Sequence, residues 1–211
     1  MMKPIAFVDL EGVLVPEMWP YLAGVAGEDG FMLTTREEPD YQKIMQRRVE
    51  LLRHHGLGVN AVERIVGNMD LLEGAEAFFL WLSSFAETWI VTDSFRPVNS
   101  KLLARFSPDR VLSNSFSTDR QGYAADMVYW HGGHGKIKAF DQADLSGRRI
   151  LAVGDGLNDL EMLRAAHCGV LLNPSSKTAS IASDLIVARS LTDVRDLFLQ
   201  KIDADACVSM R

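Results

Sequence analysis

The sequence has few cysteines, no long apolar run and no excess of positive charge. Cys168 and Cys207 are the only cysteines among 211 residues, which excludes a disulfide framework and predicts a reducing, cytoplasmic location. No apolar run approaches the ~18 residues of a transmembrane helix, and the residues before Ile5 leave no room for a signal peptide. The chain has 22 Lys and Arg against 28 Asp and Glu, a net charge of −6, which argues against nucleic acid or a membrane surface as a partner.

Hydrophobic residues, by contrast, make up 47% of the chain, enough for a sizeable core, and they alternate between short apolar runs and helical periodicity. Strands are predicted at residues 5–8, 88–92, 110–112, 149–153, 169–172 and 184–187. Helices are predicted at residues 74–85, 96–106, 135–143, 157–166, 175–182 and 191–201, whereas residues 113–133 are expected to be irregular. Strands that alternate with helices predict an α/β fold with a doubly wound parallel sheet.

One stretch of the chain contains helical patterns and no convincing strand. It covers residues 15–73, with the clearest helices at 41–52 and 60–66. We therefore predict a core of residues 1–14 and 74–211 and a helical cap of residues 15–73 inserted after the first strand. A cap over the crevice of such a core excludes water and selects the substrate.

Two acidic clusters follow predicted strands that are far apart in the sequence. Asp9 and Glu11 come after the first strand, and Asp155 and Asp159 follow the strand at 149–153. Each cluster alone is typical of a turn or a helix cap. In an open α/β sheet such strand ends meet in one crevice, so we expect the acids to converge there. Clustered carboxylates repel one another unless a cation lies among them, and hard oxygen ligands favour Mg²⁺. The sequence therefore predicts Mg²⁺-assisted phosphoryl transfer.

Four motifs, in order along the chain, resemble those of the haloacid dehalogenase-like phosphatases. They are Asp9 with Glu11, Thr92 at the end of a strand, Lys136, and the run of residues 154–159. The set is similar to the phosphoserine phosphatase group, whose core carries a helical cap. Residues 9–17, 34–36 and 39–41 are further similar to a bifunctional branch that also transfers the phosphoryl group to homoserine and likewise has Glu at the place of Glu11.

This resemblance implies a role for each motif residue. Asp9 is implied to be the nucleophile that forms an aspartyl-phosphate. Mg²⁺ would be held by Asp9, Asp155 and the backbone carbonyl of Glu11, whose side chain would act as general acid and then general base. Thr92 and Lys136 would bind the phosphoryl oxygens.

Five further residues complete the implied site. Asp159 would orient Lys136, and with Asn158 it would orient the waters of the metal. Asn158 and Asp93 are also assigned to substrate binding. Glu17 would bind the amine of the substrate and Arg48 its carboxylate.

Some of these residues keep a second interpretation. Arg48 stands on the apolar face of the predicted helix at 41–52, where it would either cover apolar surface with its stem or grip a carboxylate bidentately. Asp93 would equally cap the following helix, and Lys138 competes with Lys136. His131 and His134 have the spacing of a zinc-binding pair, but without further nearby ligands we expect a solvated loop.

The predicted protein is a Mg²⁺-dependent phosphatase whose partner is a small, phosphoserine-like metabolite, with transfer to homoserine as an optional second activity. The alternatives are the same chemistry on another small phosphate ester, a signalling receiver, and an inactive binding module. The helical insertion and the acidic motif after Lys136 argue against a receiver, and intact Asp9, Lys136 and Asp155 argue against an inactive module. The oligomeric state is left open, with a homodimer as one alternative.

Overall fold

The computed structural model describes residues 2–33, 38 and 40–208, the side chains of residues 203–208 excepted. Residues 34–36 and Pro39, which belong to the bifunctional-branch motif, and the side chain of Cys207 therefore lie outside the described part. The side chain of Cys168 is buried. No helix in the described part has the length and apolar character needed to cross a membrane.

The described strands form one sheet in the order β4-β3-β2-β1-β5-β6-β7. Their bounds are β1 Ile5–Val8, β2 Glu87–Arg96, β3 Arg110–Thr118, β4 Ala124–Val128, β5 Ile150–Gly154, β6 Cys168–Leu172 and β7 Ile186–Ala188. Every pairing is parallel except that of β3 with β4, which is antiparallel. The predicted doubly wound parallel sheet is confirmed, with one antiparallel strand added at its edge.

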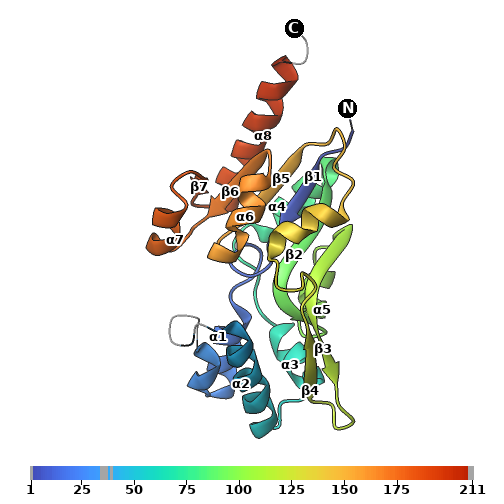
Figure 1. Ribbon diagram of the computed structural model, residues 1–211, viewed down its shortest axis with the longest axis vertical. Helices are drawn as coiled ribbons and strands as arrows, with labels where there is room; N and C mark the ends of the chain where they lie inside the picture. Colours follow the sequence, from blue (N-terminus) through green and yellow to red (C-terminus); the bar gives the residue numbers. More distant parts are fainter. Residues whose placement is uncertain (1, 34–37, 39, 209–211) are drawn as a thin grey trace.

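Helices cover both faces of this sheet (Figure 1). Their bounds are α4 Ala75–Phe85, α5 Ser100–Ala104, η2 Lys136–Gln142, η3 Leu157–Asp159, α6 Leu160–Ala165, α7 Ser176–Ile181 and α8 Leu191–Val208. Successive residues of β1 point to opposite faces: Ala6 and Val8 join the core under α4, α5 and α8, whereas Ile5 and Phe7 join the core under η2 and α6. Because both faces are covered, all four β1 side chains are fully buried.

The segment between β1 and α4 folds into helices, which gather below the sheet in Figure 1. They are α1 Met18–Ala26, η1 Asp29–Met32, α2 Tyr41–His54 and α3 Val59–Val66, and no strand occurs among the described residues of 15–73. The Asp40 side chain caps α2 by accepting from the N–H groups of Gln42 and Lys43. The predicted helices at 41–52 and 60–66 are thus confirmed.

Two predictions about local structure are wrong. The predicted helix at 96–106 begins only at Ser100, and β2 continues to Arg96, because Pro97 disfavours a helical residue before it. Residues 113–128 are not irregular but form the antiparallel hairpin of β3 and β4. Leu112, Asn114 and Phe116 alternate as buried residues of β3, and the buried polar Asn114 obscured this alternation in the sequence.

The hairpin reaches from the sheet to the helices of the cap segment, beside which it lies in Figure 1. The Arg53 guanidinium of α2 pairs with Asp119 at 2.5 Å and lies 4.9 Å from the Tyr123 ring centroid. The N–H of Val59, at the start of α3, donates to the Gly122 carbonyl at 2.9 Å. The two halves of the molecule therefore meet on this side through charged and backbone contacts.

Candidate active site

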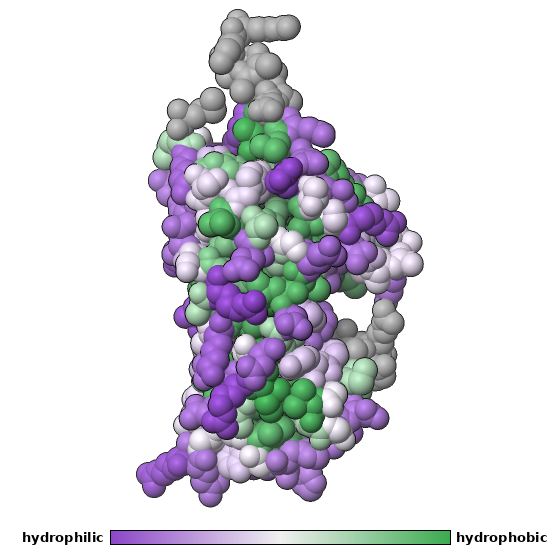
Figure 2. Space-filling model, turned by 180° about the vertical axis from the view of Figure 1, so that it is seen from behind, coloured by the Kyte–Doolittle hydropathy of each residue, from purple (hydrophilic) through white to green (hydrophobic). Residues whose placement is uncertain are grey.

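A cavity of about 920 Å³ lies at the carboxyl ends of β1, β2 and β5, under the cap helices. Figure 2 shows the molecule hollowed between its two halves. The predicted site residues in its walls are Asp9, Glu11, Glu17, Arg48, Thr92, Asp93, Lys136, Asp155 and Asn158. Asp159, the remaining predicted residue, is fully buried beside them. These side chains converge because β1 pairs with both β2 and β5, which brings the three strand ends together.

The Lys136 ammonium lies between two carboxylates at the bottom of the cavity. Its Nζ is 2.8 Å from Asp9 Oδ1 and 2.7 Å from Asp159 Oδ1, and all three side chains are almost fully buried. Burial acts to lower the pKa of Lys136, but Asp159 and Asp9 together hold it above its usual value. Lys138 instead pairs with Asp141 on the surface. The structure therefore places Lys136, and not Lys138, in the site.

One carboxylate oxygen of Asp9 has no hydrogen-bond partner among the described residues and is available to a cation. Asp9 Oδ1 accepts from the Leu10 N–H and from Lys136, which leaves Oδ2, whereas both Asp159 oxygens are occupied by Lys136 and by the N–H groups of Asp155 and Gly156. Carboxylate oxygens of Asp9, Asp155 and Asp159 lie within 4.8 Å of one another. Burial, and then the charge of Asp159, raise the pKa of Asp155 to about 7. A cluster so crowded with negative charge fits a bound metal ion.

Glycines allow these acids to pack so closely. Gly12 has φ +75°, and a Cβ there would collide with the Asp155 carboxyl group. A Cβ at Gly154 would likewise collide with the Asp159 carboxyl group. The turn after β1 closes through hydrogen bonds of the Leu10 and Val15 carbonyls, not of the Glu11 carbonyl. The Glu11 carbonyl thus remains a candidate metal ligand, as the family resemblance implies.

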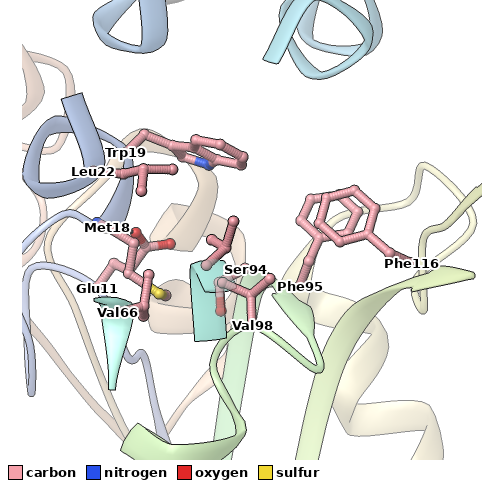
Figure 3. A pocket seen from close by; sticks show the side chains of 10 residues that line it. Glu11, Met18, Trp19, Leu22, Val66, Ser94, Phe95, Val98 and Phe116 are labelled. Atoms are coloured by element: carbon pink, nitrogen blue, oxygen red, sulfur yellow. Dashed lines mark hydrogen bonds between the residues drawn. The ribbon is translucent and has the colours of Figure 1, made fainter. Parts of the chain in front are cut away.

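The Glu11 side chain stands at the edge of a small apolar pocket. Figure 3 shows this pocket between the α1 side chains of Met18, Trp19 and Leu22 and the stacked rings of Phe95 and Phe116. Glu11 Oε1 accepts from the Met18 N–H at 2.7 Å and so caps α1. Burial, followed by the charge of Glu17, raises the pKa of Glu11 to about 8. A pKa raised in this direction favours the protonated carboxyl group that a general acid needs.

Thr92 is held in place by neighbouring polar groups. Its hydroxyl donates to Ser94 Oγ at 3.1 Å and accepts from the Ser94 N–H. Asn99 Nδ2 donates to Ser94 Oγ at 2.6 Å. Thr92, Ser94 and Asn99 are all buried, so the hydroxyl is fixed before any ligand binds. Ser94 and Asn99 were not predicted, because a lone Ser or Asn near a strand end carries no signal in the sequence.

Arg48 reaches the cavity from α2, 8% exposed. Its guanidinium carbon lies 4.6 Å from the Trp19 ring centroid, and Nη2 donates to the Leu33 carbonyl at 3.0 Å. Its buried Nε has no partner among the described residues. The guanidinium therefore lines the cavity and also packs on apolar surface, and its role in binding a carboxylate stays a prediction. Glu17, which precedes α1, lines the same cavity, and its assignment to the amine of the substrate stays a prediction.

The side chains of Asp93 and Asn158 are joined by a hydrogen bond. Asn158 Nδ2 donates to Asp93 Oδ2 at 2.8 Å, and His131 Nε2 lies 3.1 Å from Asp93 Oδ1. Although burial acts to raise it, these hydrogen bonds and the charge of Lys136 hold the pKa of Asp93 below its ordinary value. His131 and His134 lie in a loop, as predicted, and His134 is exposed, but the His131 side chain is only 13% exposed because it pairs with Asp93. The alternative of Asp93 as a helix cap fails, since its carboxylate is directed to His131 and Asn158.

Known proteins resemble this chain over most of its length. The family described as haloacid dehalogenase-like hydrolase matches residues 5–167. Phosphoserine phosphatase ThrH of Pseudomonas aeruginosa is 30% identical over 203 residues, which are 93% of this chain and 95% of that protein. Phosphoserine phosphatase of Pseudomonas syringae pv. tomato is 33% identical over 176 residues, 80% and 71% of the two chains. A solved structure of the phospho-aspartyl intermediate analogue of phosphoserine phosphatase has a TM-score of 0.75 and 19% identity, and the alignment covers 93% of this chain and 99% of that one.

Proposed function

Because this chain belongs to the haloacid dehalogenase-like hydrolase family, we propose that it is a Mg²⁺-dependent phosphoserine phosphatase that works through an aspartyl-phosphate. The predicted family is confirmed, and the chain is a phosphoric monoester hydrolase. The observation that carries the finer proposal is the buried Lys136 ammonium between Asp9 and Asp159, with Asp155 beside them.

In the proposed reaction, the Asp9 carboxylate attacks phosphorus while the bond from phosphorus to the ester oxygen breaks. Glu11 donates its proton to the departing alkoxide, and in the second half-reaction it takes a proton from the water that cleaves the acyl-phosphate. Thr92 and Lys136 bind the phosphoryl oxygens, and Asp159 orients Lys136. Asp9, Asp155 and the Glu11 carbonyl would hold Mg²⁺, which supplies charge stabilisation to the phosphoryl group when bound.

The proposed protein has a catalytic core of residues 1–14 and 74–211 and a cap of residues 15–73. The cap selects the substrate. Arg48 would bind the substrate carboxylate through donors that its packing on Trp19 leaves available. Glu17 would bind the amine. The proposal has three further parts: transfer of the phosphoryl group to homoserine, a cytoplasmic location and a homodimer.

Turnover of phosphate esters by the purified protein tests this function. We expect inorganic phosphate release from phosphoserine in the presence of Mg²⁺, and none after chelation of the metal. A panel of other phosphorylated metabolites, assayed at equal concentration, separates phosphoserine from another small phosphate ester. Failure to hydrolyse any ester with Mg²⁺ present would refute the proposal.

A further inference from the structure

His131, in the loop before Lys136, connects that loop to β2 through its side chain. Its Nδ1 accepts from the N–H groups of Gly133 at 3.1 Å and Gly135 at 3.4 Å. Because a nitrogen that accepts hydrogen bonds is not protonated, the proton of the neutral ring is on Nε2. Nε2–H therefore donates to Asp93 Oδ1 at 3.1 Å.

Further hydrogen bonds fix the relative position of this loop and the end of β2. Trp130 Nε1 donates to the Thr92 carbonyl at 3.1 Å, and Asn114 Nδ2 donates to the Asp93 carbonyl at 2.7 Å. Asp93 Oδ2 accepts from Asn158, which follows β5. Asp93 is thus the point at which three separate segments of the chain meet.

These hydrogen bonds restrain a carboxylate that would otherwise repel a phosphate group in the cavity. The Asp93 carboxylate lines the same cavity as Thr92 and Lys136, directly after the hydroxyl that is assigned to phosphate binding. A carboxylate free to turn toward a phosphate dianion would repel it. Hydrogen bonds to both of its oxygens, from His131 and from Asn158, restrain the carboxylate and offset part of its charge.

We infer that His131 is a positioning residue for phosphate binding: its Nε2–H holds the Asp93 carboxylate toward the loop and Asn158, away from the bound phosphoryl group. This inference rests on the proposed function, since it assumes that Thr92 and Lys136 receive the phosphate. His131 acts through Asp93 and does not itself touch the substrate.

Two conservative variants separate the two ring nitrogens of His131. His131→Gln keeps an N–H donor near the place of Nε2, and His131→Asn keeps only an acceptor near the place of Nδ1. His131→Ala should raise KM for phosphoserine and the inhibition constant of inorganic phosphate about tenfold, with a smaller change in kcat, since one hydrogen bond to a charged group is lost. His131→Gln should restore most of this loss, and His131→Asn should not. The reverse ranking would overturn the inference and show that His131 only supports the loop.

Further variants isolate the contact with Asp93. In an Asp93→Asn background, His131→Ala should add little further loss, because the charge that His131 restrains is already gone. His134→Ala removes an exposed imidazole from the same loop and should have a much smaller effect than His131→Ala. Full additivity of the His131 and Asp93 variants would overturn the inference.

Measurements without turnover distinguish this inference from the proposed function. Nitrogen-15 NMR of the free protein should show His131 as the Nε2–H tautomer, and an Nδ1–H tautomer would overturn the inference even in an active enzyme. Calorimetry with inorganic phosphate should rank wild type and His131→Gln above His131→Ala and His131→Asn. An enzyme that binds phosphate in this order but hydrolyses no ester would refute the proposed function and leave the inference standing.

Discussion

Replacing Arg48 by Met should reduce activity on substrates that carry a carboxylate and spare those that do not. The guanidinium is buried and stacked on Trp19, and only one of its nitrogens, Nη2, reaches a backbone oxygen, that of Leu33. Its Nε has no partner among the described residues. Arg48 is therefore desolvated and still has donors available for a ligand. Met keeps an unbranched apolar side chain at this buried position beside Trp19, so the packing of α2 should survive the change.

The expected loss follows from these contacts. A charge-assisted, bidentate contact between Arg48 and a carboxylate in a desolvated site contributes about 2–4 kcal/mol. Since about 1.4 kcal/mol corresponds to a factor of ten, kcat/KM for phosphoserine should fall by roughly thirtyfold to several hundredfold. An aryl phosphate without a carboxylate should be hydrolysed nearly as well as by the wild type.

Steady-state kinetics on phosphoserine and 4-nitrophenyl phosphate would test this prediction. Arg47→Met is the matched control, because Arg47 lies on the same helix but is exposed, and it should leave both activities near the wild-type values. Thermal unfolding of each variant reports on the stability of the fold. Equal losses on the two substrates would refute the reasoning and show that Arg48 holds the cap together instead of binding substrate.

Three further changes test the assigned chemistry. Asp9→Asn should abolish turnover while the protein stays folded, and it should prevent binding of beryllium fluoride with Mg²⁺. Retained activity would exclude Asp9 as the nucleophile. Lys136→Met should lower kcat/KM for every phosphate ester by at least about a hundredfold, since it removes a buried charge from between two carboxylates. Lys138→Met should have little effect, because Lys138 pairs with Asp141 on the surface. Similar losses in both variants would contradict the assignment of Lys136. Glu11→Gln should suppress hydrolysis of phosphoserine and also phosphoryl transfer to homoserine, both of which phosphorus NMR can follow. If the wild-type protein with saturating homoserine yields only inorganic phosphate, the proposed transfer to homoserine is wrong.

The sequence by itself determined the architecture and which acidic residues share one crevice. Runs such as Ile5–Val8 are apolar throughout, as strands covered on both faces must be, and helices separate them, so a parallel sheet was predictable. A parallel sheet places its carboxyl ends together, and for that reason Asp9 and Asp155 could be assigned to one crevice from the sequence alone. Their flanking glycines were visible as well, although not the close contact that requires them.

Only the tertiary structure decided which polar residues meet inside that crevice. Lys136 and Lys138 are equivalent in local sequence, and the burial of Lys136 between Asp9 and Asp159 separates them. His131 is a loop residue, and its contact with Asp93 could not be predicted because Asp93 lies on another segment that the β3–β4 hairpin brings close. Local periodicity reports which face of an element is buried but not which side chain lies opposite. The physical reason is that such pairings depend on how distant segments pack, and their hydrogen bonds leave no repeating pattern in the chain.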